Sequence, residues 1–479
     1  DAAASGGTLA AQGARQDRTA EADGITKISQ VPAEEVLFFR SLGFSNYYII
    51  KIYDLVGDAA IALTQDNAFW LLEEFPRLGF PEVDETARRL GMAADSPYRV
   101  QAAVEFAMRT YLTEGHAFAP LEELSLRVGA LLELGSAIIS DVLEDMVFEG
   151  RLQLAEVEGK RVVYVYGYYK AECTIAGKLA AMANPPKGLV KVCANAEAML
   201  HKAEGETGIA LSAQQKEAVR VALRSGVSII TGGPGTGKTT VIRTLLSMLE
   251  GGGLKTAVAA PTGRAAKRIM ETSGHYACTI HRLLEYYYDE MASGMAFGRN
   301  ALQPLECQAV IIDEASMMDL MLAEALCDAL QPGTRLILVG DADQLPSVGA
   351  GNVLRDLLNS EYFDTIRLTE IYRQAADSGI VQSAHRINRG EYPQFSDDFQ
   401  LVRGDKQQEI IAELAGRCPR EDVQVLTPVK KGILGSVNLN LKLQETFNPP
   451  EKDKPELTFG KRVFRMGDRV MQIKNDYRL

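Results

Sequence analysis

The segment that most constrains the fold is VSIITGGPGTGKTT, residues 227–240. A β-branched run leads directly into a glycine-rich turn and then into helix-forming residues, which is the strand, loop and helix order of a phosphate-binding loop. Gly232, Gly235 and Gly237 let backbone amides turn toward phosphate oxygens, and the start of the helix adds partial positive charge. The segment therefore predicts a nucleotide-binding domain.

Two side chains of this loop can carry the chemistry of nucleotide binding. Lys238 can reach the β and γ phosphates of ATP, and Thr239 can supply an oxygen to magnesium. ATP and magnesium are therefore the expected cofactors. The remaining residues of the predicted binding loop are Gly232, Gly233, Pro234, Gly235, Thr236, Gly237 and Thr240.

From Leu211 onward, short β-branched runs alternate with helical segments, which is typical of parallel α/β sheets. A linker is expected at residues 184–188, because two consecutive prolines interrupt helix formation there. The expected strands are residues 227–231, 256–260, 309–313, 335–339 and 423–426.

Two of these strands end in polar residues that suit phosphate chemistry. Asp313 can bind magnesium directly or through water, and Glu314 can orient and deprotonate the attacking water. Gln344, in the turn after residues 335–339, is the candidate sensor of the γ phosphate, since an amide can contact both water and a phosphate oxygen. Acids at a strand end can also be a solvated cap and polar turns are ordinary, so both assignments depend on the upstream loop.

The residues ahead of the α/β part predict helical modules. Residues 33–97 contain two helical passages, each with a Leu-Gly-Phe corner at Gly43 or Gly79, as in tandem helix-hairpin-helix motifs. A simple turn between packed helices is the alternative. Residues 1–32 are expected to be a disordered tail or a linker. Residues 1–24 are rich in Ala, Gly and charge and lack the apolar middle of a secretory signal.

Residues 98–183 have the outline of a winged helix, with three helices followed by a hairpin. The expected turn of the hairpin is Glu158-Gly159. The third helix, residues 136–149, is rich in acidic side chains that would repel DNA phosphates. We therefore favour a structural or protein-contacting role for this module over sequence recognition.

Composition excludes several classes of protein. No uninterrupted apolar stretch approaches the length of a membrane span, so a cytoplasmic protein without membrane contact is expected. The net charge of −12 argues against a wholly basic surface, although a motor that holds nucleic acid in a groove needs only local positive potential. Zinc and iron–sulfur sites are not supported by the spacing of the six cysteines, which are Cys173, Cys193, Cys278, Cys307, Cys327 and Cys418.

A set of eight segments carries a family resemblance. The chain contains, in this order, LSAQQKEAV, TGGPGTGKTT, APTGRAAKRI, TIHRLL, IIDEASMMD, VGDADQLPSVGAG, LTEIYRQA and VLTPVKKGILGSVNLN. This order resembles the RecD/TraA group of superfamily 1B DNA helicases, and the paired hairpins ahead of it resemble the stand-alone, long form of RecD. The resemblance implies RecA-like motor domains and an ATP-dependent helicase or translocase in DNA repair or recombination, moving 5′ to 3′ on single-stranded DNA and at duplex junctions.

The resemblance also implies roles for individual residues. Gln215 would read the adenine edge, and Arg373 would reach the γ phosphate from the second motor domain. The first motor domain would span residues 184–360 and the partial second one residues 361–479. The track for single-stranded DNA would be lined by Pro261, Thr262, Arg264, Thr279 and His281, together with Thr427 and Pro428 from the second motor domain.

The segment between TIHRLL and IIDEAS resembles the small hairpin, or pin, that separates the strands of a duplex in this family. It corresponds to an insertion at about residues 284–306, in which Tyr286, Tyr287 and Phe297 could abut the terminal base pair. A disordered surface loop is the alternative interpretation.

The resemblance does not include the last motifs of the family. The family continues past IKNDY with an SH3-like insertion and two further motifs, the last of which contains an arginine that stabilises the transferred phosphoryl group. Without that arginine the chain is expected to bind nucleotide but to hydrolyse it slowly. Two alternatives stay open, an ATP-binding scaffold in a recombination complex and the helicase portion of a conjugative relaxase, and protein partners are not predicted.

Overall fold

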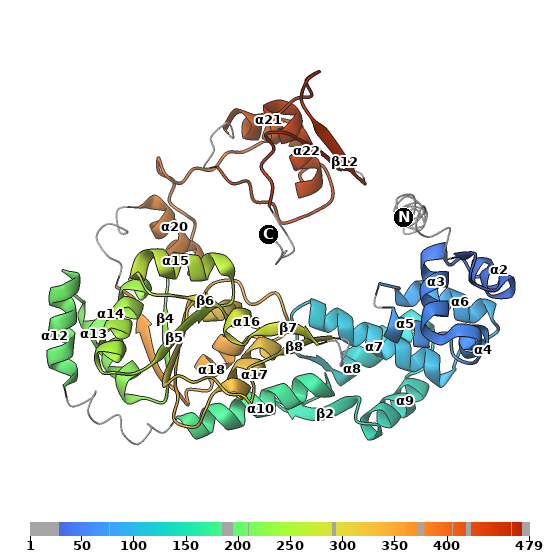
Figure 1. The fold of residues 1–479 in the computed structure, drawn as a ribbon, viewed down its shortest axis with the longest axis horizontal. Coiled ribbons are helices and arrows are strands. Elements are labelled where there is room, and N and C mark those ends of the chain that lie inside the picture. The colour runs from blue at the N-terminus through green and yellow to red at the C-terminus, as the bar shows by residue number, and fades with distance from the viewer. Residues whose placement is uncertain are drawn as a thin grey trace. The chain divides into compact units, whose positions relative to one another are not determined.

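The structure is a computed structural model. It describes residues 28–75, 77–183, 195–208, 210–289, 294–370, 378–404, 406–417, 423–460 and 462–471. Its internal contacts divide the chain into two units, one of residues 64–399 and the other of residues 1–63 with 400–479. Figure 1 labels the helices and strands of both units. None of the described helices is long and apolar enough to cross a membrane.

The larger unit is built on a six-stranded sheet with the order β11-β4-β10-β9-β5-β6. Every pair of neighbouring strands in this sheet is parallel. All the carboxyl ends of the strands therefore lie at one edge. The strands are β4 (Val227–Gly232), β5 (Thr256–Ala260), β6 (Cys278–Thr279), β9 (Ala309–Ile312), β10 (Arg335–Gly340) and β11 (Asp364–Leu368).

Helices cover both faces of this sheet, because alternate residues of its strands are buried in two separate cores. Ile229 of β4 belongs to one hydrophobic core, and its neighbour Ile230 belongs to the other. The first core is closed by α10 (Tyr166–Met182), α17 (Leu320–Ala329) and α18 (Val353–Asn359). The second is closed by α12 (Ala196–Thr207), α13 (Ala213–Arg224), α14 (Lys238–Gly251) and α15 (Gly263–Ser273).

Four of the five expected strands are confirmed, with boundaries that differ by at most one residue. The expected strand at residues 423–426 is wrong, because these residues have no regular secondary structure. Its β-branched residues are not enclosed by a sheet, and Leu426 is 87% exposed. β6 and β11 were not expected, since the first is very short and the second, DTIRL, is interrupted by charge.

The amino-terminal part of the larger unit has the expected winged-helix outline. Its hairpin consists of β2 (Leu152–Val157) and β3 (Lys160–Val165), and the turn residues Glu158 and Gly159 both have positive φ, as a tight hairpin turn requires. β1 (Phe118–Pro120) completes an antiparallel sheet with the order β1-β3-β2. The helices are α5 (Trp70–Glu74), α6 (Phe80–Arg89), α7 (Pro97–Thr113), α8 (Leu121–Leu132) and α9 (Ser136–Phe148).

A buried ion pair holds α6 against α7. Arg99 is 1% exposed, and its Nε and Nη2 donate to the two carboxylate oxygens of Asp84 at 2.6 and 3.0 Å. Its Nη1 also donates to the carbonyl oxygen of Ala94 at 2.7 Å. Because this guanidinium is fully desolvated, its partners are needed to keep the fold of this module.

α10 joins the winged-helix-like module to the sheet of the larger unit. It follows β3 directly, with Val165 as its N-cap residue, and it buries Ala171, Ile175 and Leu179 in the first core. Near its end, Lys178 Nζ donates to Asp328 Oδ1 at 2.7 Å. The helix is expected within residues 98–183, but its packing also makes it part of the core beside the six-stranded sheet. The expected linker at 184–188 lies outside the described residues.

The smaller unit contains short elements from both ends of the chain. From the amino-terminal part come α2 (Ala33–Ser41), α3 (Asn46–Val56), η1 (Gly57–Ala59) and the start of α4 (Ala60–Asp66). From the carboxyl-terminal part come α21 (Gln407–Arg417), α22 (Ser436–Phe447), β12 (Glu456–Phe459) and β13 (Arg462–Arg465), with β12 and β13 antiparallel. The two Leu-Gly-Phe corners differ, because Gly43 has φ of 97° whereas Gly79, with φ of −87°, is the N-cap residue of α6.

Candidate active site

The motifs expected to carry chemistry lie at the carboxyl edge of the sheet. The loop of residues 233–237 follows β4, Asp313 and Glu314 follow β9, and residues 341–345 follow β10. β10 lies between β4 and β9, so the loop and the two acids are separated by one strand. Ligands of open parallel sheets bind at this edge, and this placement therefore supports the predicted nucleotide site.

The loop leads into α14 through a left-handed residue, as a phosphate-binding loop does. Gly237, the N-cap residue of α14, has φ of 79°, a conformation that favours glycine. Lys238 begins the helix, and its Nζ donates to the carbonyl oxygens of Gly232 and Gly233, the latter at 3.1 Å. The ammonium group thus lies over the loop, where phosphate oxygens could replace these carbonyl acceptors.

Only glycine fits at position 232, because Thr236 and Leu368 lie too close to leave room for a Cβ atom. A Cβ atom there would lie 2.7 Å from Thr236 Oγ1 and 2.8 Å from the carbonyl oxygen of Leu368. Thr236 is buried, and its hydroxyl donates to the carbonyl oxygen of Gly233 at 2.9 Å. The base of the loop is therefore closed by its own residues and by the end of β11.

Gln215, predicted to read adenine, braces the loop from α13. Its Nε2 donates to the carbonyl oxygen of Thr236 at 3.3 Å, and its Oε1 accepts the amide of Ser212 at 3.1 Å in a capping box. The residue is 1% exposed. Gln215 therefore supports the phosphate loop in this structure. Its contact with adenine stays a prediction.

Asp313 is a partly buried carboxyl group beside the loop. Burial raises its pKa to about 6, a backbone hydrogen bond from the amide of Glu314 works against this shift, and the charge of Glu314 adds to it. That amide donates to Asp313 Oδ1 at 2.9 Å. Lys238 and Arg268 also favour the charged form. A cation would stabilise the ionised carboxylate further, which is the environment expected of a metal ligand.

Glu314 has a strained backbone and an unsatisfied side chain. Its φ of 53° and ψ of 40° are left-handed, which is uncommon for a residue other than glycine. Its Oε2 is buried and has no hydrogen-bond partner among the described residues. Strain and unpaired polar atoms of this kind cluster at functional sites, so both observations support the predicted general base.

Gln344 lies in the turn that follows β10. The turn is tied to β4, because the amide of Ala342 donates to Thr231 Oγ1 at 3.2 Å. The side chain of Gln344 is exposed, and its Nε2 lies 3.5 Å from Asp341 Oδ2. The residue is therefore at the correct edge of the sheet, and its contact with a γ phosphate stays a prediction.

The side chains at this edge fit a magnesium ion bound to phosphate. Asp313 and Thr239, in the first turn of α14, offer a carboxylate and a hydroxyl oxygen. Within the described residues no group of three or more His, Cys, Asp or Glu could hold a metal by itself. Magnesium commonly takes one or two protein ligands together with phosphate oxygens and water, so this small donor set suits it.

Five of the residues predicted to line the DNA track lie at or just after the ends of β5 and β6. Thr262 caps α15 by accepting the amide of Ala265 at 3.3 Å, and Thr279 caps α16 (Ile280–Leu283) by accepting the amide of Arg282 at 3.1 Å. Both threonines thus have a local structural role. Pro261 precedes Thr262 at the end of β5, and Arg264 is exposed.

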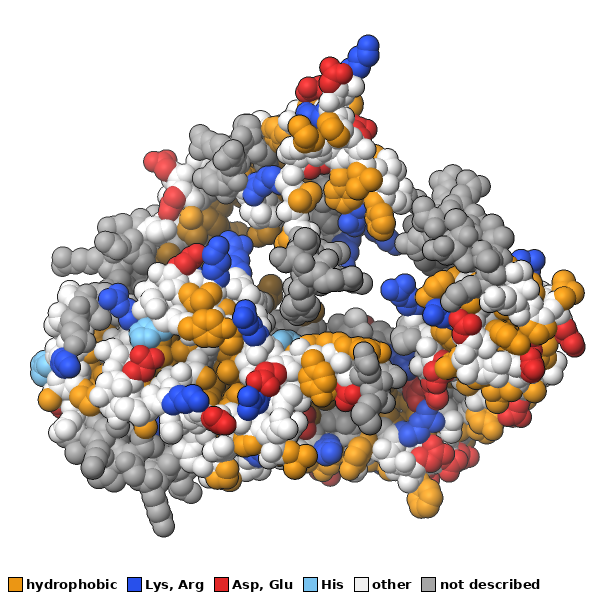
Figure 2. Space-filling model, in the orientation of Figure 1, with side chains coloured by type: hydrophobic (Ala, Val, Ile, Leu, Met, Phe, Trp, Pro, Cys, Tyr) orange, Lys and Arg blue, Asp and Glu red, His pale blue; other side chains and the backbone are white. Residues whose placement is uncertain are grey.

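α15 presents basic side chains to solvent. Arg264, Lys267 and Arg268 are exposed on this helix, and Figure 2 shows Lys and Arg side chains over it. This local positive charge, at the same sheet edge as the phosphate loop, is the kind of surface that contacts a polynucleotide backbone. The overall negative charge of the chain therefore does not prevent such a contact.

The insertion after α16 is a hairpin, as the first of the two interpretations expected. β7 (Tyr286–Asp289) pairs antiparallel with β8 (Gly294–Phe297). The Tyr286 and Phe297 rings lie 4.7 Å apart between centroids, and the His281 ring lies 5.1 Å from Tyr286. His281 thus packs on the base of the hairpin, and these three rings form a group that we call the aromatic base.

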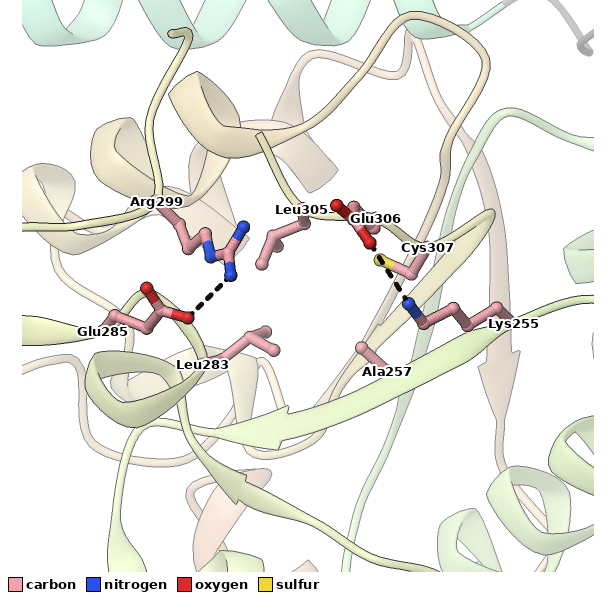
Figure 3. A pocket seen from close by; sticks show the side chains of 8 residues that line it. All are labelled: Lys255, Ala257, Leu283, Glu285, Arg299, Leu305, Glu306 and Cys307. Carbon is pink, nitrogen blue, oxygen red and sulfur yellow. Dashed lines mark hydrogen bonds and ion pairs between the residues drawn. The ribbon is translucent and has the colours of Figure 1, made fainter. Parts of the chain in front are cut away.

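A pocket of about 210 Å³ lies at the opposite, amino edge of the sheet (Figure 3). Lys255 precedes β5 and Cys307 precedes β9, so the pocket is distinct from the phosphate loop. Burial raises the pKa of Cys307 to about 11, which keeps it a neutral thiol. Its other lining residues are Ala257, Leu283, Glu285, Arg299, Leu305 and Glu306.

The described part of the larger unit does not include three of the predicted site residues. Arg373 lies outside the described residues. Thr427 and Pro428 belong to the smaller unit, where Thr427 Oγ1 donates to the carbonyl oxygen of Leu434 at 2.7 Å. Their predicted contacts with nucleotide and DNA stay predictions.

One polar contact was not anticipated from the sequence. Gln214 Oε1 accepts the amide of Thr369 at 2.9 Å, and its Nε2 donates to Thr369 Oγ1 at 2.9 Å. Thr369 follows β11, on the segment that leads to Arg373. No local pattern distinguishes Gln214 from its neighbour Gln215, and only the fold shows that the two amides face different partners.

Comparison with known proteins agrees with this geometry. Three family models match the chain: an AAA domain at residues 210–406, an ATP-dependent RecD2 DNA helicase HHH domain at 31–118, and an ATP-dependent RecD-like DNA helicase SH3 domain at 439–479. A protein of Deinococcus radiodurans described as an ATP-dependent RecD2 DNA helicase is 34% identical over 439 residues. Over most of its length the chain is similar to the RecD-like helicases.

This RecD-like chain spans somewhat more than half of that relative, since the match covers 88% of the chain and 58% of the Deinococcus protein. The RecBCD enzyme subunit RecD of Mycobacterium tuberculosis is 40% identical over a shorter range, 30% of this chain and 28% of that protein. Among solved structures, the Pif1 helicase of Candida albicans aligns at 23% identity over 47% of this chain and 60% of its own. Its TM-score of 0.31 is too low to relate the two folds.

The family models correct one expectation and confirm another. We expected the SH3-like insertion only after residue 477, but the SH3 model matches residues 439–479, which include β12 and β13. β12 and β13 have four residues each and are largely exposed, so hydropathy alone does not separate this module from a second motor domain. The expected helix-hairpin-helix region is confirmed, and its model extends to residue 118, into the part expected to be a winged helix.

Proposed function

We propose that this chain provides the ATP-binding and strand-contacting part of an ATP-dependent DNA helicase that acts in the cytoplasm, in DNA repair or recombination. The protein would couple ATP hydrolysis to 5′ to 3′ movement on single-stranded DNA and separate strands at duplex junctions. The observation that carries this proposal is the strained, unpaired Glu314 at the same sheet edge as the phosphate loop and the partly buried Asp313.

The chemistry assigned to these residues is in-line hydrolysis of the terminal phosphate. Lys238 would bind the β and γ phosphates, and Asp313 with Thr239 would hold magnesium, which neutralises phosphate charge when bound. Glu314 would accept a proton from water as the water oxygen bonds to the γ phosphorus and the bond to the β-phosphate oxygen breaks. Gln344 would contact the γ phosphate, and Arg373 would reach it from the second motor domain.

DNA would be held beside this site by the ends of β5 and β6. Phosphates would contact the residues around Thr262 and Thr279, with the basic side chains of α15 beside them. The aromatic base would meet the bases, since aromatic rings stack on bases of any sequence. This arrangement would place nucleotide and strand on the same sheet edge, so that changes at one site could move the other.

The buried, unpaired Oε2 of Glu314 also argues against an ATP-binding scaffold. A scaffold that only binds nucleotide has no use for a carboxylate oxygen that is buried without a partner, because such an atom costs about 1–3 kcal/mol of folding free energy. A proton-accepting role explains why this cost is retained. The matches to a RecD2 HHH domain and to a RecD2 helicase favour the stand-alone helicase over the relaxase alternative.

Substitution of Glu314 in the intact protein tests the proposal. Glu314→Gln should abolish DNA-stimulated ATP turnover while preserving nucleotide binding. Glu361→Gln is a matched control, because Glu361 also has a positive φ, of 52°, but is exposed away from the carboxyl edge. Unchanged turnover in the Glu314 variant would refute the assignment of the base.

Strand displacement tests the motor itself. The intact protein should displace the strand of a 5′-tailed duplex and not that of a 3′-tailed duplex. Lys238→Ala should abolish this activity together with nucleotide affinity, since it removes the phosphate-binding ammonium group. Displacement of neither substrate by the unsubstituted protein would contradict the helicase proposal.

A further inference from the structure

A histidine from a distant part of the chain lies against the phosphate loop. His385 belongs to α20 (Gly379–Asn388). A Cβ atom added to Gly233 would lie 2.7 Å from His385 Cε1 and 3.4 Å from its Nε2. The imidazole therefore occupies the space beside Gly233 that any larger residue would need.

One nitrogen of this imidazole is unsatisfied. His385 Nε2 is buried and has no hydrogen-bond partner among the described residues. A buried polar atom of this kind is destabilising unless a partner reaches it. Since the ring borders the phosphate loop, an oxygen of a bound nucleotide is the partner that the location offers.

The position of Lys238 indicates which phosphate is involved. Its Nζ donates to the carbonyl oxygen of Gly233, the residue that His385 contacts, at 3.1 Å. In phosphate-binding loops the lysine reaches the β and γ phosphates, whereas backbone amides hold the α and β phosphates. A group that shares Gly233 with this lysine therefore lies near the β and γ phosphates that the lysine would reach.

α20 is held firmly enough to transmit such a contact. Asp398 accepts the amides of Gly379 and Ile380 at 3.1 and 3.4 Å, at the start of the helix. Near the middle of the helix, Ser383 Oγ donates to the carbonyl oxygen of Gln394 at 2.6 Å. These bonds join α20 to residues 394–398, so a force on His385 would act on this whole segment.

We infer that His385 is a nucleotide-binding residue that donates a hydrogen bond from Nε2 to the γ phosphate of ATP. The inference rests on the proposed nucleotide site and adds a second reader of the triphosphate to it. His385 distinguishes ATP from ADP, because only the triphosphate places an oxygen at this position. Through its bonds to residues 394–398, α20 then responds to the presence of the γ phosphate.

The test is a comparison of ATP-type and ADP affinities. Displacement of a fluorescent nucleotide from the chain would be measured with a non-hydrolysable ATP analogue and with ADP. His385→Leu keeps the bulk of the ring but removes its nitrogen atoms, and it should weaken the analogue by about tenfold, as expected for one lost hydrogen bond to a charged oxygen, without changing ADP affinity. His385→Gln, which retains a donor at similar reach, should restore most of the affinity.

Controls separate this inference from the function on which it rests. His201→Leu replaces a histidine on α12 whose side chain is 75% exposed, and it should change neither affinity. Circular dichroism would verify that each variant is folded. If Lys238→Ala weakens both nucleotides but His385→Leu weakens neither, or both equally, the role of His385 is refuted. If Lys238→Ala leaves both affinities unchanged, the nucleotide site itself is refuted, and the inference with it.

Discussion

Replacing Asp313 by Asn should stabilise the protein while removing a magnesium ligand. The rise of the Asp313 pKa from 3.8 to about 6 corresponds to about 3 kcal/mol, since a tenfold change in an acid constant is about 1.4 kcal/mol. This free energy is the cost of ionising the partly buried carboxyl group in the folded state. Asn carries no charge and can still accept the amide of Glu314, so it avoids this cost.

The effect of Asp313→Asn has a defined pH window. Because the folded-state pKa is raised, the folded protein binds more protons than the unfolded chain between about pH 4 and pH 6, and its stability falls as pH rises through that range. The advantage of the Asn variant should therefore be absent below pH 4 and complete above pH 6. At pH 8 the Tm of the Asn variant should be about 6–12 °C higher than that of the unsubstituted protein. This range assumes about 2–4 °C for each kcal/mol, the value for domains of about 150–250 residues.

Thermal unfolding without magnesium, followed by circular dichroism at pH 4 and pH 8, measures this difference. Asp343→Asn is the matched control, because Asp343 lies at the same sheet edge but is exposed. Magnesium with a non-hydrolysable ATP analogue should stabilise the unsubstituted protein more than the variant, since only the carboxylate gains an ion partner. An Asp313 variant that is no more stable than the unsubstituted protein at pH 8 would refute the assigned burial of charge.

Three further predictions concern packing and the strand track. Arg99→Ala should lower the free energy of unfolding by about 3–5 kcal/mol, measured by urea denaturation, because it leaves the carboxylate of Asp84 without its buried partner; a loss below 1 kcal/mol would contradict this. Gly232→Ala should reduce nucleotide affinity more than Gly233→Ala in the same displacement assay, because the added methyl group meets the backbone at Gly232 but a movable side chain at Gly233; the reverse order would show that the loop is held differently. Phe297→Ala should slow strand displacement by the intact protein and leave ATP turnover on single-stranded DNA unchanged, and an equal loss of both would exclude a role in strand separation.

The sequence predicts the four central strands of the six-stranded sheet because the hydropathy of each of these strands, and the polar residues that follow it, are visible in the local sequence. The β-branched runs of β4 and β10 are buried on both faces, and polar residues follow each strand directly. Parallel pairing then brings those polar ends to one edge without further information. This is why the loop, Asp313 and Glu314 could be identified before the fold was known.

The features that were missed depend on contacts between distant segments. His385 has no local pattern that relates it to Gly233, and Gln214 differs from Gln215 only in what the fold places opposite it. β11 is interrupted by charge, so its place beside β4 follows from pairing and not from hydropathy. The expected strand at residues 423–426 failed for the opposite reason, because strand-forming residues there meet no neighbouring strand.

α10 connects the winged-helix-like module to the six-stranded sheet without a flexible linker. The helix leaves β3 without an intervening loop and ends in the motor core, and Gly351 donates its amide to the carbonyl oxygen of Gly115 as an additional link. A rotation of the six-stranded sheet should therefore turn this module with it, because α10 and this hydrogen bond join the two. If the sheet moves during ATP hydrolysis, a duplex or protein bound to the module would move with it.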